Sequence, residues 1–257
     1  MTIELSRREE FAVLTINRPE ALNALSFQLV ADIASALDEV AAMADIRGLI
    51  ITGAGEKAFC AGADITELMG LDPATQKRAT VSGQRAFDKL AELAVPSLAL
   101  INGFAFGGGL ELAMACTLRA ATPNARMGLP EIKLGLIPGY GGTQRLPRLI
   151  GEARALDMIL SGRFIDASEA ERIGLVTRLL DADNPMEQGL AYMREVSGFS
   201  LPVLAMAREA ITRASDLPVR EGLKIEADLS TLTFQTDDAQ EGMAAFVEKR
   251  KPEFKDQ

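Results

Sequence analysis

Short apolar runs alternate with helical patterns through the first two thirds of the chain, and this alternation restricts the fold more than any other feature. The expected elements are a hairpin over 3–16, helices over 27–43 and 75–93, a loop over 53–62, buried strands over 48–52 and 96–101, and a short strand over 118–121. Six further helices are expected between residues 151 and 249, and helices alone in the last third. Strands that alternate with helices favour a parallel sheet with helical crossovers. The sequence therefore predicts an α/β core over residues 1–195 and a helical region over residues 196–257.

The composition argues against several classes of protein. The 257 residues include no histidine, which removes Ser-His-Asp and Cys-His catalysis and most catalytic zinc sites. The formal net charge of −9 argues against general binding to nucleic acid. Cys60 and Cys116 are too few for a disulfide framework, so a reducing, cytoplasmic setting is expected. The apolar region 95–118 is interrupted by Asn102, the three glycines at 107–109 and Glu111, so no membrane span is expected there.

Two glutamates lie in stretches of glycine, proline and small apolar residues. Glu111 follows three glycines at 107–109, and Glu131 lies between Pro130 and Ile132. An unpaired carboxylate is costly to bury, so two of them in apolar surroundings suggest a general acid and a general base that work together. The simpler interpretation is that both are solvated, or bonded to backbone N–H groups, and at this point it remains open.

The glycines at 107–109 open a helix expected over 108–116. The first N–H groups of a helix have no intrahelical partner, and glycine lets another group approach the backbone closely. The Gly108 N–H could therefore stabilise a developing oxyanion, with Glu111 one turn further along the same helix face. A second loop of small residues, 59–65, places Asp64 at a helix N-cap position. The simpler alternatives are tight helix packing for the glycines and plain capping for Asp64.

Five segments, in this order along the chain, resemble the crotonase (enoyl-CoA hydratase/isomerase) superfamily. They are 17–25 (NRPEALNAL), 59–65 (FCAGADI), 107–113 (GGGLELA), 130–146 (PEIKLGLIPGYGGTQRL) and 241–252 (EGMAAFVEKRKP). Each motif is moderately specific, and all five in order are strongly specific. Together they extend the resemblance over nearly the whole chain.

The resemblance implies a spiral of ββα repeats, with C-terminal helices that drive assembly into trimers and hexamers. It implies an acyl-CoA substrate that carries the coenzyme A itself, with no separate cofactor and no metal. Because both family glutamates are present, it indicates an enoyl-CoA hydratase, which adds water to a trans-2-enoyl-CoA to give a 3-hydroxyacyl-CoA, as in fatty-acid beta-oxidation. The alternatives are another crotonase reaction, such as Δ3,Δ2-enoyl-CoA isomerisation, or a non-catalytic CoA- or RNA-binding paralogue.

The resemblance also assigns roles by position in the motifs. The catalytic glutamates map to Glu111 and Glu131, and the oxyanion N–H groups to Ala63 and Gly108. Contacts to the acyl-CoA map to Ala24, Ala61, Asp64, Ile65, Gly139, Phe246 and Lys249. Phe246 and Lys249 would approach the coenzyme A, in one arrangement from a neighbouring subunit. Tyr140 and the loop 68–74 are candidates for the wall of the acyl pocket.

Overall fold

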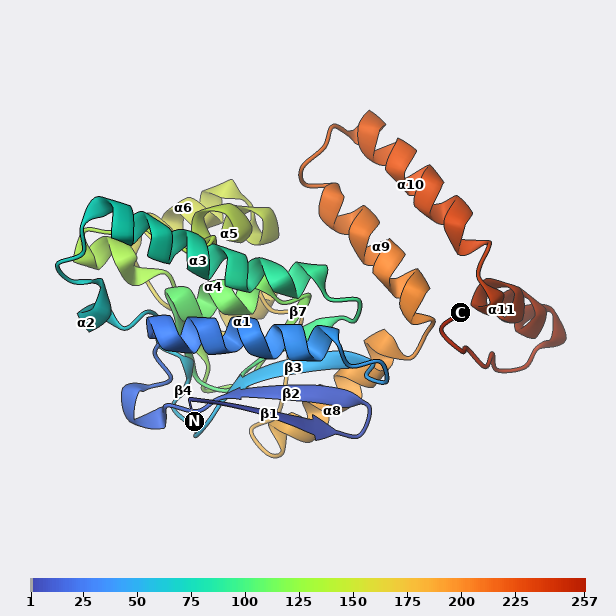
Figure 1. Cartoon of the computed structure of the whole chain (residues 1–257), viewed down its shortest axis with the longest axis horizontal. Coiled ribbons are helices and arrows are strands. Elements are labelled where there is room, and N and C mark those ends of the chain that lie inside the picture. The colour runs from blue at the N-terminus through green and yellow to red at the C-terminus, as the bar shows by residue number, and fades with distance from the viewer. Residues whose placement is uncertain (1) are drawn as a thin grey trace. The chain divides into compact units, whose positions relative to one another are not determined.

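The computed structural model describes residues 2–257, which divide into a first unit that ends at Tyr192 and a second unit, Met193–Gln257. Figure 1 shows strands and helices mixed in the first unit and only helices after it. Among the described residues, no helix is long and apolar enough to cross a membrane. The predicted division of labour between a catalytic core and an oligomerisation region stays a prediction.

One sheet of the first unit has six strands in the order β1-β2-β3-β5-β7-β10. The strands are β1 (Ile3–Arg8), β2 (Phe11–Ile16), β3 (Gly48–Gly53), β5 (Ser97–Ile101), β7 (Leu118–Ala121) and β10 (Arg178–Leu179). The hairpin of β1 and β2 is antiparallel, with Ile3 opposite Ile16, and every other pair is parallel. The predicted hairpin and the three predicted strands are confirmed. The prediction that helices alone fill the last third is wrong, because β10 lies there.

A second sheet has four short strands in the order β4-β6-β8-β9. They are β4 (Ala58–Cys60), β6 (Phe104–Phe106), β8 (Arg126–Gly128) and β9 (Ile165–Asp166). Along the chain β3 is followed by β4, β5 by β6, and β7 by β8, so each successive pair adds one parallel strand to each sheet. This repetition confirms the predicted spiral. The prediction of a loop throughout 53–62 is wrong, because a strand as short as β4 leaves no alternating pattern in the sequence.

Helices and turns surround the two sheets. They are η1 (Pro19–Ala21), α1 (Phe27–Ala41), α2 (Ile65–Leu68), α3 (Pro73–Glu92), α4 (Gly108–Ala115), η2 (Pro130–Leu134), α5 (Gly142–Ile150), α6 (Glu152–Ser161), α7 (Ala167–Arg172) and α8 (Pro185–Ser197). The Ser26 hydroxyl accepts the Leu29 N–H and caps α1, as predicted. Helix α3 begins two residues before the predicted start, because Asp72 accepts the N–H groups of Ala74 and Thr75. Helix α5 was not predicted, since glycines open it and Pro147 lies inside it.

The second unit contains three helices, α9 (Leu201–Arg213), α10 (Val219–Thr233) and α11 (Asp237–Glu248). Their predicted existence is confirmed, and α9 packs against α10. The C-terminal segment folds back on α11, where Asp238 accepts the Lys255 N–H and Glu241 pairs with Arg250. Apolar side chains of all three helices are exposed, namely Ile211, Leu223, Leu232, Phe246 and Val247.

Helix α4 is buried along its whole length up to Met114, and glycine lets it approach β4 closely. A Cβ atom added to Gly109 would lie 2.0 Å from the carbonyl oxygen of Cys60 in β4. Backbone cannot yield as a flexible side chain can, so a larger residue would force the helix and the strand apart.

We expect Gly109→Ala to lower the free energy of unfolding by about 1–3 kcal/mol, as overpacking typically does. Gly108→Ala is the matched control, because the nearest atom to its new Cβ would be the terminal Cδ1 of the Leu25 side chain at 3.1 Å, not backbone. Chemical denaturation of both variants measures the difference. Equal stability of the two variants would show that this contact does not limit the packing of α4.

Candidate active site

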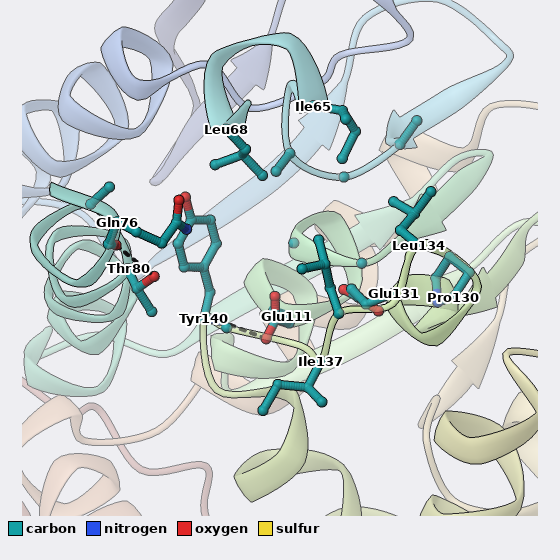
Figure 2. A pocket seen from close by; sticks show the side chains of 18 residues that line it. Ile65, Leu68, Gln76, Thr80, Glu111, Pro130, Glu131, Leu134, Ile137 and Tyr140 are labelled. Carbon is teal, nitrogen blue, oxygen red and sulfur yellow. Dashed lines mark hydrogen bonds between the residues drawn. The ribbon is translucent and has the colours of Figure 1, made fainter. Parts of the chain in front are cut away.

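A cavity of about 250 Å³ opens in the first unit, beside α3, η2 and the first turn of α4. Most of its wall is apolar, and the polar side chains that line it are Gln76, Thr80, Glu111, Glu131 and Tyr140. Figure 2 shows Glu111 and Glu131 on one side of this space and Gln76 and Thr80 of α3 on another. An apolar cavity with a few convergent polar groups is the usual form of a small-molecule site.

Glu111 lies on α4, is only 2% exposed, and is held by the backbone of a neighbouring loop. Its Oε1 atom accepts the N–H of Tyr140 at 2.8 Å (Figure 2) and the N–H of Gly142 at 2.7 Å. A Cβ atom at Gly142 would lie 3.0 Å from this oxygen and 2.8 Å from Pro138 Cβ, so glycine is needed for the approach. The backbone therefore satisfies one carboxylate oxygen and fixes the side chain.

Burial raises the pKa of Glu111 from 4.5 to about 7, although the two backbone hydrogen bonds act in the opposite direction. The negative charge of Glu131 raises this pKa further. A carboxyl group with a pKa near neutrality can both give and take a proton at physiological pH.

Glu131 lies on η2 and lines the same cavity. Its Oε2 atom is buried and has no hydrogen-bond partner within residues 2–257. Burial raises its pKa as well. The backbone of Gly107 permits its position, because Gly107 has φ +48° and a Cβ there would lie 2.8 Å from Glu131 Oε1. The two glutamates thus line one cavity, Glu111 buried and Glu131 half-buried, and repulsion between their charges disfavours the state in which both are ionised.

The N–H groups of Ala63 and Gly108 lie near each other on the cavity wall. A Cβ atom on Gly108 would lie 3.6 Å from the Ala63 nitrogen. Leu25 donates to Gly62 and accepts from Asp64, which fixes the loop on both sides of Ala63. Within the described chain, neither the Ala63 N–H nor the Gly108 N–H donates to another backbone group. Two free donors side by side can stabilise one oxyanion.

The three glycines at 107–109 therefore serve different purposes. Gly107 makes room for Glu131, Gly108 lines the cavity, and Gly109 lets α4 pack on β4. Tight packing therefore accounts for Gly109, and the oxyanion role of the Gly108 N–H stays a prediction. A substitution at Gly107 would therefore disturb Glu131, so it cannot serve as a control for a substitution at Gly108.

The remaining predicted contacts fall into three groups. Ala61, Ile65 and Gly139 line the cavity. Ala24 and Asp64 are not part of its wall; Arg18 donates to the Ala24 carbonyl at 2.8 Å and to Asp64 at 3.2 Å, and the predicted contacts of both residues to the acyl-CoA stay predictions. Asp64 also caps α2 by accepting the Thr66 N–H, so the simpler capping interpretation describes its contacts. Phe246 and Lys249 lie in the second unit, and their approach to coenzyme A stays a prediction.

Sequence reasoning missed two parts of the cavity wall. One is the apolar loop side, where Leu134, Leu136 and Ile137 line the cavity. The other is the face of α3 that carries Gln76, Ala79 and Thr80. The spacing of three and four residues in α3 places these small and polar side chains on one face, and that pattern is the signal that could have identified them.

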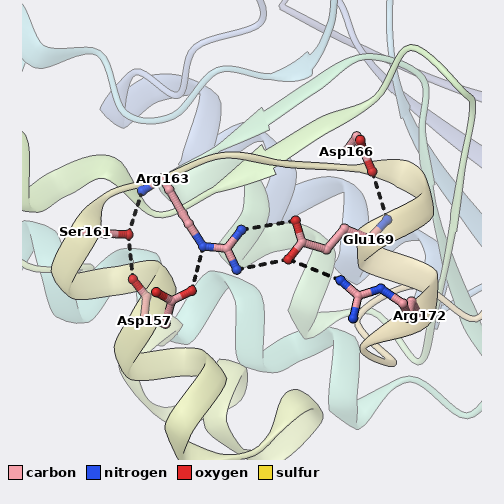
Figure 3. A network of polar contacts seen from close by, with 6 residues as sticks. All are labelled: Asp157, Ser161, Arg163, Asp166, Glu169 and Arg172. Carbon is pink, nitrogen blue, oxygen red and sulfur yellow. Dashed lines mark hydrogen bonds and ion pairs between the residues drawn. The ribbon is translucent and has the colours of Figure 1, made fainter.

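A network of ion pairs around Arg163 joins α6 to α7 (Figure 3). Arg163 donates to Asp157 at 2.6 Å and to both oxygens of Glu169 at 3.0 and 3.1 Å. The next residue, Phe164, packs its ring 4.3 Å from that of Phe106 and lies under the Lys133 ammonium group of η2. Exposed ion pairs contribute little to stability, so the network acts mainly by fixing this geometry.

The pKa of Glu111 makes stability depend on pH. The folded protein binds this proton more tightly than the unfolded chain does, so stability falls as pH rises from the unfolded pKa toward about 7. Glu111→Gln keeps the Oε1 acceptor but cannot ionise. We expect the difference in the free energy of unfolding between the variant and the wild type to grow in favour of the variant by up to about 3 kcal/mol as the pH rises from about 5 to about 8. Urea unfolding across this range tests it, and a difference that is constant with pH would contradict it.

Comparisons with known proteins agree with this geometry. The model of the enoyl-CoA hydratase/isomerase family matches residues 6–257. A protein of Rhizobium meliloti named "Probable enoyl-CoA hydratase" is 44% identical over 254 residues, which are 99% of this chain and 98% of that protein. The "Crotonyl-CoA hydratase" of Syntrophomonas wolfei is 40% identical over 98% of this chain and 97% of its own length. The crystal structure of an enoyl-CoA hydratase from Bacillus anthracis is 36% identical and covers 100% of both chains with a TM-score of 0.94. The chain belongs to the enoyl-CoA hydratase/isomerase family.

Proposed function

We propose that this protein is an enoyl-CoA hydratase, which adds water to a trans-2-enoyl-CoA and forms a 3-hydroxyacyl-CoA. The observation that carries the proposal is a pair of carboxyl groups, the buried Glu111 and the half-buried Glu131, that line one apolar cavity beside two free backbone N–H groups. The relatives named as enoyl-CoA and crotonyl-CoA hydratases support it. The reaction needs no cofactor beyond the coenzyme A that the substrate carries.

The thioester oxygen of the substrate would accept the N–H groups of Ala63 and Gly108. Addition of water at C3 moves electron density through C2 to this oxygen, which gains negative charge as the new C–O bond forms. The two N–H groups stabilise that charge, and they are already in place before the reaction, so little reorganisation is needed. The partial positive charge at the start of α4 acts in the same direction.

The two glutamates would handle the protons. The amide hydrogen bonds of Glu111 favour its ionised form, which suits it to take a proton from water. Glu131 has a buried oxygen without a partner, which favours its protonated form and suits it to give a proton to C2. When Glu131 carries the proton, its charge no longer raises the pKa of Glu111. Hydroxide then bonds to C3, the proton bonds to C2, and the double bond becomes single.

A second proton-transfer group distinguishes hydration from isomerisation. Moving a double bond between the C3–C4 and C2–C3 positions needs one base that carries a proton between C2 and C4, whereas hydration needs water to be held and split. Because both carboxyl groups line the cavity, hydration is the reaction that uses the whole site. Parallel assays with 2-enoyl and 3-enoyl thioesters separate the two reactions.

Four subsidiary proposals accompany this function. The protein assembles as a homo-oligomer, a trimer or a dimer of trimers, which is supported by the exposed apolar side chains of the second unit. Phe246 and Lys249 approach the coenzyme A. Neither nucleic acid nor a membrane is a partner, and the acidic charge supports the first of these. A cytoplasmic location is supported by two free cysteines. Light scattering distinguishes the oligomer from a 27.5 kDa monomer.

Replacement of either glutamate by glutamine tests the acid–base assignment. We expect Glu111→Gln and Glu131→Gln each to lower kcat on crotonyl-CoA by about 100- to 10,000-fold, the usual contribution of such groups. Binding of a non-reactive acyl-CoA should change little, because the isosteric amides keep the cavity shape. Stopped assays measure kcat, and calorimetry measures the binding of the acyl-CoA. Wild-type turnover by Glu131→Gln would exclude the mechanism with two carboxyl groups.

Two substitutions at one residue test the oxyanion hole. Gly108 is the first residue of α4, a position where proline is tolerated because its N–H is not needed for the helix. Gly108→Pro removes the donor, and Gly108→Ala adds a Cβ atom but keeps the donor. We expect kcat of the proline variant to lie about 100- to 1,000-fold below that of the alanine variant. The melting temperature of each variant controls for folding, and similar turnover by both would show that the Gly108 N–H is dispensable.

A further inference from the structure

The ring of Tyr140 is wedged between α3 and the start of α4. A Cβ atom at Gly83 of α3 would lie 2.3 Å from Tyr140 Cε1, and one at Gly108 would lie 3.3 Å from Tyr140 Cδ2. The Phe87 ring of α3 meets the Tyr140 ring edge-on, with centroids 5.5 Å apart. The ring is therefore fixed by contacts along its length, and the residue is only 7% exposed.

Gly83 has no other evident purpose in α3. Glycine in the middle of a helix is destabilising, because it loses more backbone freedom than alanine does. Gly83 does not have the positive φ that would call for glycine. Because Gly83 has no side chain, it leaves a space that the Tyr140 ring occupies. The two residues form a matched pair, in which one side chain is absent so that the other fits.

Tyr140 also connects this pair to the catalytic groups. Its N–H donates to Glu111, and its side chain lines the cavity. In Figure 2 the ring extends from the loop beside Glu111 toward Gln76 of α3, across the side of the cavity that α3 forms. Its hydroxyl makes no hydrogen bond within residues 2–257, so the ring is held there by packing alone. A fixed aromatic wall at this place limits what can lie beyond the reacting carbons.

We propose that Tyr140, seated against Gly83, sets the depth of the acyl cavity and restricts the enzyme to short acyl chains. This inference rests on the proposed hydratase function. The oxyanion donors and the two glutamates would fix the thioester, C2 and C3, so each further carbon must fit between them and the wall of α3 and Tyr140. Each methylene that can be buried strengthens binding about fourfold. A chain that meets the ring loses this gain. Gly83 acts as a positioning residue, because it decides where the ring lies.

The test compares kcat/KM for crotonyl-CoA and its six-, eight- and ten-carbon homologues. In the wild type we expect the value to fall as the chain lengthens. Tyr140→Ala opens the wall and should raise the ratio of the eight-carbon to the four-carbon value at least about tenfold, since two methylenes gain burial. Tyr140→Phe keeps the ring and should leave that ratio within about twofold of wild type. Gly83→Ala pushes the ring into the cavity and should lower the ratio of the six-carbon to the four-carbon value.

An unchanged ratio in Tyr140→Ala would overturn the proposal, and so would a Phe variant that behaves like the Ala variant. Because Gly83→Ala can also destabilise the fold, melting temperatures of both single variants and of the double variant Gly83→Ala/Tyr140→Ala are measured. Removal of the ring should restore the stability that Gly83→Ala loses, and additive losses would contradict the pairing. If the wild type hydrates no enoyl-CoA, the proposed function fails, whereas this stability cycle still tests the pairing.

Discussion

Two backbone hydrogen bonds to Glu111 connect the parts of the structure on which the proposed reaction depends. Of the two N–H groups that meet at its Oε1 atom, that of Tyr140 belongs to the loop before α5 and that of Gly142 to the first residue of α5, whereas Glu111 belongs to α4. This contact fixes one carboxyl group, anchors the loop, and places the Tyr140 ring against α3. Because the carboxylate is buried, loss of these bonds would leave a charge without compensation, which is far more costly than an exposed one.

The spiral of strand pairs explains why groups distant in sequence meet at this point. The loop after β4 carries Ala63, the turn after β6 carries Gly107 and Gly108, and the segment after β8 carries Glu131. Since β4, β6 and β8 are parallel neighbours, their carboxyl ends lie at one edge of the second sheet. Each repeat therefore delivers one part of the proposed site: first the Ala63 N–H, then the Gly108 N–H with Glu111, then Glu131.

The cavity has closely packed glycine backbone and an apolar wall, and both favour a reaction in which one substrate oxygen gains negative charge. Glycine backbones at 107–109 and 142 let oxygen atoms and helices approach more closely than any other residue would allow. The surrounding apolar wall raises the pKa of both glutamates, which brings one of them to about 7. The same wall strengthens the effect of fixed N–H donors, because water does not compete for the charge. Chemistry and substrate fit thus depend on the same close packing.

The sequence by itself determined the fold class, the long elements, and the candidates for the acid–base pair and the oxyanion donors. Strong periodicity and the glycine-rich motifs made these visible. The strands of the second sheet, helix α5 and the cavity wall on α3 were decided only by the tertiary structure. Three-residue strands carry no pattern of their own, and a helix face gains its meaning from what packs against it. That Asp64 is held by Arg18, and that the Tyr140 ring fills the space at Gly83, follows from contacts between distant segments, which no local pattern encodes.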